Sequence, residues 1–161
     1  MTGQKVRYDG EHRFNQRIAA WIAPHVTLLP LCPEAAIGMG IPRPPIQIRQ
    51  TARGLRAVGR DNPAIEVTTA LNHFGDIITR TYPALCGYIF QSRSPSCGVG
   101  TTPVFDERGR EIGLGSGLVA QRLADHDPAL PLLNDTDLLD DAAAAHFLER
   151  VQQRFLNLDK P

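Results

Sequence analysis

The segment from Cys86 to Gly98 restricts the fold of this chain more than any other stretch. Its first part, Tyr88–Phe90, has the length and the β-branched and aromatic composition of a buried strand. A polar turn follows, and Cys97 closes it. Ligands of an open α/β sheet bind just beyond the carboxyl ends of its strands, so we expect Cys97 at the mouth of a site. A buried structural cysteine after a core strand is the alternative.

The turn before Cys97 carries the hydroxyls of Ser92, Ser94 and Ser96, together with Arg93. A thiol beside an arginine and loop amides is expected to shift towards the thiolate. Because the thiolate is the form that binds a metal or attacks a substrate, Cys97 is a candidate for either role.

A second cysteine follows a second apolar run. Residues Val26–Leu31 are predicted to form a buried strand despite Pro30, and Cys32 comes next. The loop at 35–45 is rich in glycine, which lets the backbone approach a ligand closely, and in proline, which presets its shape. Two strand ends that each deliver a cysteine indicate a site more strongly than one alone. Glu34 is then either a helix-start carboxylate or an acid or base of that site.

Apolar periodicity and turn signals predict the remaining elements. With 161 residues the chain is expected to form a single domain, 1–161. The other predicted elements are, in chain order, a short helix capped by Asn15, a hairpin at 46–58, a helix beginning near Thr68 with the stripe Val67, Leu71, Phe74 and Ile78, a strand at 104–105, a helix from Leu118, a strand at 130–133 and a C-terminal helix capped by Asp140 or Asp141.

Charge and cysteine content limit the function classes. The 17 basic and 17 acidic side chains cancel, so no global field favours nucleic acid or a membrane surface. Residues 1–60 do carry nine Lys and Arg against three Asp and Glu, which suits solvated surface or an anionic ligand. Three cysteines without a signal peptide or long apolar run predict a reducing, cytoplasmic location and no disulfide framework.

Three separated motifs resemble a known bacterial family. They are Gly-Gln-Lys-Val-Arg-Tyr-Asp-Gly at 3–10, Leu-Cys-Pro-Glu at 31–34 with Ile-Gly-Met-Gly-Ile-Pro-Arg-Pro-Pro at 37–45, and Cys-Gly-Tyr-Ile-Phe at 86–90 with Ser-Pro-Ser-Cys-Gly at 94–98. Their order and content are similar to the 2-thiouracil desulfurase family, formerly a domain of unknown function. The longer second motif is similar to members in which a second domain follows this one.

The resemblance implies an α/β fold of three layers: a Rossmann-like, mostly parallel sheet with helices on both faces. It also implies a [4Fe–4S] cluster held by three cysteines, with one iron left open to take sulfur from a thiolated nucleobase. Cys32 and Cys97 match two cluster ligands, Glu34 matches an active-site carboxylate, and Ser94 matches a nearby hydroxyl. The first family cysteine and the first strand would precede residue 1, so this chain is expected to lack both. Two cysteines alone would hold the implied [4Fe–4S] cluster poorly.

Cys86 is not expected to replace the missing ligand. It starts the strand that Cys97 follows, and a rise of about 3.3 Å per residue separates the two by about 15 Å. Cys86 is therefore interpreted as a core thiol. Two other hypotheses stay open: a cluster-free enzyme with Cys97 as nucleophile and Glu34 as base, and a non-catalytic regulatory or nucleic-acid-binding module that uses the arginines of 43–60.

Overall fold

The computed structural model describes residues 1–158. No helix within that range is both long and apolar enough to cross a bilayer. In chain order the elements are the π-helix η1 (Ile18–Ile22), α1 (Pro33–Ala36), β1 (Ile46–Thr51), β2 (Gly54–Gly59), α2 (Thr68–Thr81), β3 (Tyr88–Phe90), β4 (Thr102–Phe105), β5 (Glu111–Gly115), α3 (Leu118–His126), β6 (Leu132–Asn134), the 3-10 helix η2 (Asp137–Leu139) and α4 (Asp141–Leu158).

Four strands form a mixed sheet in the order β2-β1-β4-β5. The two central strands, β1 and β4, are parallel. At the edges of the sheet, β2 pairs antiparallel with β1, and β5 pairs antiparallel with β4. The predicted hairpin at 46–58 is confirmed, and its turn uses Gly54 at φ +86°, where a side chain would be strained. Arg53 N donates to Thr51 Oγ1 at 3.1 Å within the same turn.

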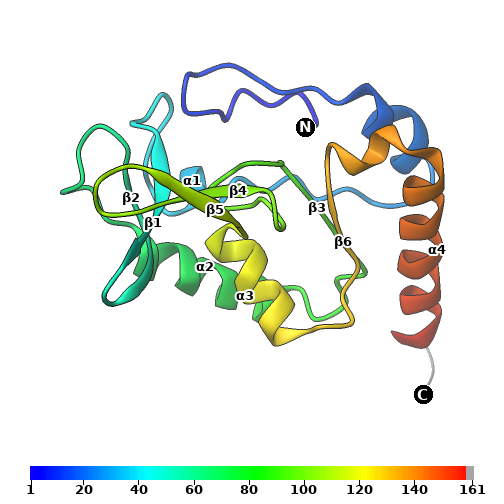
Figure 1. Ribbon diagram of the computed structural model, residues 1–161. Coiled ribbons are helices and arrows are strands. Elements are labelled where there is room, and N and C mark those ends of the chain that lie inside the picture. The colour runs from blue at the N-terminus through cyan, green and yellow to red at the C-terminus, as the bar shows by residue number, and fades with distance from the viewer. Residues whose placement is uncertain (159–161) are drawn as a thin grey trace.

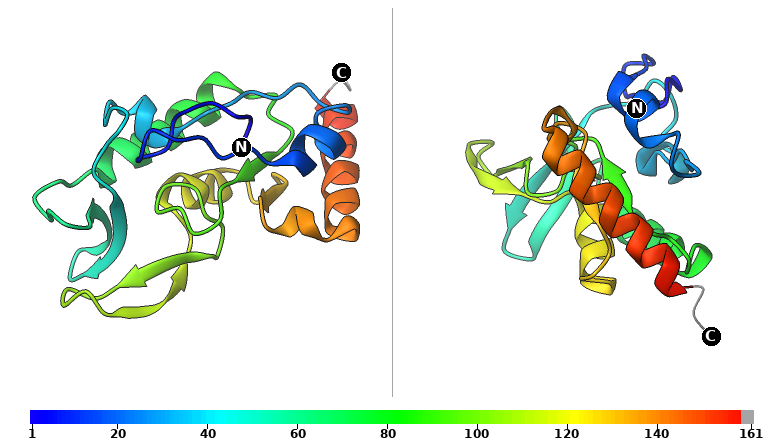
Figure 2. Two further views of the ribbon diagram at one scale, coloured as in Figure 1. Left: turned by 90° about the horizontal axis from the view of Figure 1, so that it is seen from above. Right: turned by 90° about the vertical axis from the view of Figure 1, so that its right-hand side faces the viewer.

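The parallel pair β3 and β6 lies between the four-stranded sheet and α4 (Figures 1 and 2), and its side chains contribute to two apolar cores. Phe90 faces the first core, which β1, β4, α2 and α3 complete. Ile89 faces the second core, in which Phe147 and Val151 of α4 meet Ile18 of η1. Because neighbouring side chains of a strand point to opposite faces, helices cover both faces of this pair. The predicted α/β class with three layers is confirmed.

Close packing joins α2 to α3, which lie side by side. A Cβ placed on Gly75 would lie 2.9 Å from Arg122 Cβ, so glycine lets the two helices approach. Asp76 and Arg122 form an ion pair across the same contact. The C-terminal helix begins as predicted, since Asp140 Oδ1 accepts a hydrogen bond from Ala142 N at 2.9 Å.

Two sequence predictions fail in detail. Val26–Leu31 forms no strand, because no described segment pairs with it and Pro30 has no N–H to donate. Conversely, the sequence did not predict β5, because Gly113 and Gly115 are typical of a loop before α3. Pairing with β4 makes it a strand although Ile112 and Leu114 are exposed.

Candidate active site

The turn that carries Cys97 rests on the first turn of α3. Within the turn, Gly98 N donates to Ser94 O at 2.9 Å. From α3, Leu118 N donates to Pro95 O at 3.1 Å and Val119 N to Ser96 O at 3.0 Å. These are N–H groups that a helix start cannot satisfy internally, so the loop and the helix fix one another.

Glycine is required where the two segments meet. A Cβ on Gly117 would lie 2.5 Å from both Cys97 N and the carbonyl carbon of Ser96. That approach is closer than real Cβ contacts allow, so any other residue at 117 would displace the cysteine turn.

Cys32 lies at the N-cap of α1, and Pro33 opens that helix. Proline suits the first helical position because its φ is already helical and no N–H is lost there. Ala36 N donates to Cys32 O at 2.9 Å, which closes the first turn. The turn directs Glu34 inward, and its side chain is buried.

The carboxylate of Glu34 is held from two sides. Arg43 Nε donates to Oε2 at 2.8 Å, and Ser96 Oγ donates to Oε1 at 2.8 Å. The guanidinium of Arg43 also donates from Nη1 to Val6 O at 2.9 Å and to Gly40 O at 3.2 Å. A buried ion pair is tolerated only when such hydrogen bonds satisfy its remaining groups.

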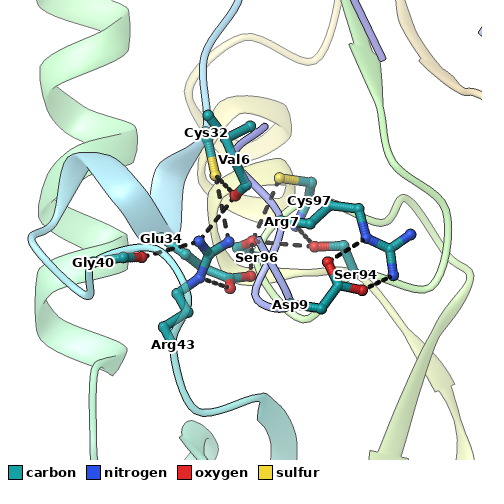
Figure 3. Close-up of polar contacts among 10 residues, drawn as sticks. All are labelled: Val6, Arg7, Asp9, Cys32, Glu34, Gly40, Arg43, Ser94, Ser96 and Cys97. Atoms are coloured by element: carbon teal, nitrogen blue, oxygen red, sulfur yellow. Dashed lines mark hydrogen bonds and ion pairs between the residues drawn. The ribbon is translucent and has the colours of Figure 1, made fainter. Parts of the chain in front are cut away.

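Both predicted cysteine ligands touch this network (Figure 3). Arg43 Nη2 lies 3.5 Å from Cys32 Sγ, and Ser96 Oγ lies 3.5 Å from Cys97 Sγ. A continuous series of polar contacts therefore runs from one sulfur to the other through Arg43, Glu34 and Ser96. The structure brings together Cys32, Cys97 and Glu34, which lie on separate segments of the sequence.

Ser94 lies beside the site but does not contact the carboxylate of Glu34. Its Oγ lies 3.1 Å from Ser96 Oγ and accepts from Cys97 N at 3.3 Å, with no bond to Glu34. Sequence reasoning missed both Ser96 and Arg43 as direct partners of the carboxylate. Because polar residues are plentiful in both loops, only their folded positions distinguish these two.

The prediction that the pKa of Cys97 is lowered, which would favour the thiolate, is wrong. Burial raises the pKa of Cys97 to about 12, against a smaller lowering by the hydrogen bond with Ser96. Arg93, expected to favour the thiolate, is exposed. Burial also raises the pKa of Tyr88, and the charges of Cys97 and Cys32 add to that rise. Tyr88 therefore lies within electrostatic reach of both sulfurs.

An apolar groove of about 760 Å³ opens beside the site. Val26–Leu31 lines one part of it, and Tyr88 and Ile89 of β3 line another. Cys86 lies in this groove and packs against the second core, with Sγ 3.3 Å from Ala84 O. That packing supports the interpretation of Cys86 as a core thiol.

The described residues do not by themselves make a metal site. Within 1–158, no group of three or more His, Cys, Asp or Glu side chains could hold a metal ion. Cys32 and Cys97 supply two soft sulfur ligands, whereas an iron–sulfur cluster is normally held by more. The donor set present fits such a cluster only in part.

Comparison with known proteins identifies the chain. A sequence model described as 2-thiouracil desulfurase matches residues 1–135. The chain belongs to the 2-thiouracil desulfurase family. A solved structure described as the [4Fe–4S]-dependent thiouracil desulfidase TudS is similar to it, with 27% sequence identity, a TM-score of 0.66, and coverage of 90% of this chain and 92% of that one. A search of the curated proteins gives no match.

Family membership confirms what the three motifs predicted. The match covers 1–135, so it includes Cys32, Glu34 and Cys97 but not α4. The roles of individual residues are not fixed by the match. The assignments of Cys32 and Cys97 as ligands and of Glu34 and Ser94 as catalytic groups stay predictions.

Proposed function

We propose that this protein removes sulfur from a thiolated pyrimidine such as 2-thiouracil at the Cys32–Cys97 site. One observation carries the proposal: a buried carboxylate, Glu34, is held between the two cysteines of the family motifs by Arg43 and Ser96. Family membership and the similarity to the desulfidase TudS support it.

The reaction replaces the sulfur of a thiocarbonyl by the oxygen of water. The C=S bond is lost, a C=O bond forms, and both protons of the water leave with sulfur as hydrogen sulfide, so no oxidant or reductant is needed. Glu34 is the group that takes a proton from water and returns it to the departing sulfur. Arg43 keeps the carboxylate in place, and Ser96 connects it to the Cys97 sulfur.

We also infer that Cys32 and Cys97 bind a [4Fe–4S] cluster. The solved relative is described as [4Fe–4S]-dependent, and the two sulfurs touch one polar network. Within residues 1–158, no third side chain joins these two sulfurs in a group that could hold a metal ion.

Iron and sulfide measurements test the two proposals separately. Anaerobically reconstituted protein is assayed for bound iron, acid-labile sulfide and sulfide release from 2-thiouracil. Cys32→Ala and Cys97→Ala should each lose the iron, whereas Cys86→Ala should keep both iron and turnover. Equal iron loss in all three variants would contradict the ligand assignment.

Glu34→Gln tests the proton-transfer role. Glutamine still accepts a hydrogen bond but cannot take a proton, so the variant should keep its iron and release sulfide at least 100-fold more slowly. A thermal melt checks that the unpaired Arg43 has not unfolded it. Turnover at the wild-type rate in folded Glu34→Gln would exclude the role.

A further inference from the structure

A cleft of about 630 Å³, here called the arginine cleft, is lined mainly by residues of the β1–β2 hairpin. Figure 1 shows the position of this hairpin at one edge of the four-stranded sheet. The cleft belongs to neither the cysteine site nor the apolar groove. Its lining residues are Arg49, Thr51, Arg53, Arg56, Val58, Pro63, Glu66, Thr69 and Glu107.

Two arginines of this cleft face each other across the hairpin. Arg49 of β1 pairs in register with Arg56 of β2, so both side chains leave the same face of the sheet. The neighbouring pair, Ile48 and Ala57, faces the core. Like charges placed directly opposite destabilise an antiparallel pair. The hairpin therefore keeps an arrangement that costs stability.

The charge of these arginines is not matched by close ion pairs. Within residues 1–158, Arg49, Arg53 and Arg56 form no salt bridge, and the guanidinium of Arg49 donates no hydrogen bond. The Nε atoms of Arg49 and Arg56 are shielded from solvent and have no partner. Arg56 Nη2 donates to Arg53 O at 3.2 Å, which satisfies one terminal group only.

The start of α2 also borders the cleft. Thr69, in the first turn of this helix, is a lining residue, and Thr68 N donates to Glu66 Oε1 at 2.8 Å. Glu66 and Glu107 oppose the positive field of the arginines. Hydrogen bonds from Thr68 lower the pKa of Glu66, and Arg56 and Arg53 lower it further. Three guanidinium groups against two carboxylates leave the cleft net positive.

We propose that the arginine cleft binds the phosphate group of a small phosphate ester such as a nucleotide. The fork of an arginine matches two phosphate oxygens, and three arginines line one cleft of ligand size together with Thr69. A bound phosphate would also relieve the repulsion between Arg49 and Arg56. The flanking Glu66 and Glu107 disfavour a long polyanion that would have to cross them.

Calorimetric titration of the full chain tests the proposal with three probes: pyrophosphate, uridine 5′-monophosphate and uridine. The first two should bind and uridine should not. Arg49→Gln and Arg56→Gln should each weaken binding roughly ten-fold or more, because each removes a charge-assisted hydrogen bond. Arg80→Gln is the matched control, since it removes the same charge near the other end of α2, and it should bind as the wild type does.

Thermal melts separate a binding role from a structural one. Without ligand, Arg49→Gln should melt at or above the wild-type temperature, because it removes the like-charge pair. Pyrophosphate should raise the melting temperature of the wild type and of Arg80→Gln but not of Arg49→Gln. Unchanged affinity in Arg49→Gln, or a lower melting temperature without ligand, would overturn the proposal. Binding of a short single-stranded RNA without binding of the monophosphate would overturn it as well.

Discussion

Arg43 shows how much of a site can depend on one side chain. Its guanidinium contacts the carboxylate of Glu34, the carbonyls of Val6 and Gly40, and the sulfur of Cys32. These partners come from the N-terminal segment, from α1 and from the loop after it. Only a planar group with five donors reaches all of them, so lysine is no substitute there.

The two serines of the cysteine turn allow a sharp test at this scale. Ser96→Ala should lower the free energy of unfolding by about 1–3 kcal/mol, since it leaves Oε1 of buried Glu34 without its donor. It should also slow sulfide release more than Ser94→Ala does, because Ser94 makes no bond to Glu34. Denaturant unfolding and initial rates of both variants decide the matter. A larger rate loss in Ser94→Ala would return the catalytic role to Ser94.

At the scale of elements, the site depends on the start of α3, where that helix meets the cysteine turn. Hydrogen bonds join the helix start to Pro95, Ser96 and Gly98. The cysteine turn follows β3 in the sequence, and hydrogen bonds anchor it to the start of α3. Displacement of either element would move Cys97 relative to Glu34.

Gly117→Ala tests this dependence. The added Cβ would lie 2.5 Å from Cys97 N, so the turn must move, at a cost of about 1–3 kcal/mol typical of overpacking. Iron binding and sulfide release should fall with stability. Ser116→Ala, which adds no atoms one residue earlier, should keep both. Wild-type iron content in Gly117→Ala would show that the turn is not a fixed part of the site.

At the scale of the whole molecule, carboxylates that are hydrogen-bonded in the folded chain make its stability depend on pH. Asp76 of α2 pairs with Arg122 of α3, and that hydrogen bond lowers the pKa of Asp76. Hydrogen bonds with backbone groups and with Arg110 likewise lower the pKa of Asp106 in the β4–β5 turn. Each of these two carboxylates therefore binds a proton more weakly in the folded chain than in the unfolded chain.

Stability should therefore decrease in acid. A carboxyl group whose pKa is lower in the folded chain than in the unfolded chain stabilises the fold at any pH above its unfolded-state pKa. That stabilisation is lost as the pH falls through its folded-state pKa. The melting temperature should drop as pH falls from about 5 to about 3, a range that begins above the ordinary Asp pKa of about 3.9 and ends below it. Asp76→Asn should make this slope shallower, whereas Glu149→Gln on the exposed side of α4 should not. An identical slope in Asp76→Asn and the wild type would contradict the assignment.

The sequence alone determined the local elements and the family. Apolar periodicity located α2 and α4, β-branched and aromatic composition located β3, and Asp140 marked the start of α4, because these signals lie within a few residues of one another. The three motifs identified the desulfurase family and singled out Cys32, Glu34 and Cys97. Local chemistry is readable from the sequence when it depends on neighbours along the chain.

The tertiary structure decided what depends on partners far along the chain. It left Val26–Leu31 unpaired, made β5 a strand by pairing it with β4, and placed Ser96 rather than Ser94 on Glu34. It also reversed the expected shift at Cys97, since burial outweighs the nearby donors. Strand pairing, burial and side-chain contacts between distant segments are properties of the folded chain, and no local pattern encodes them.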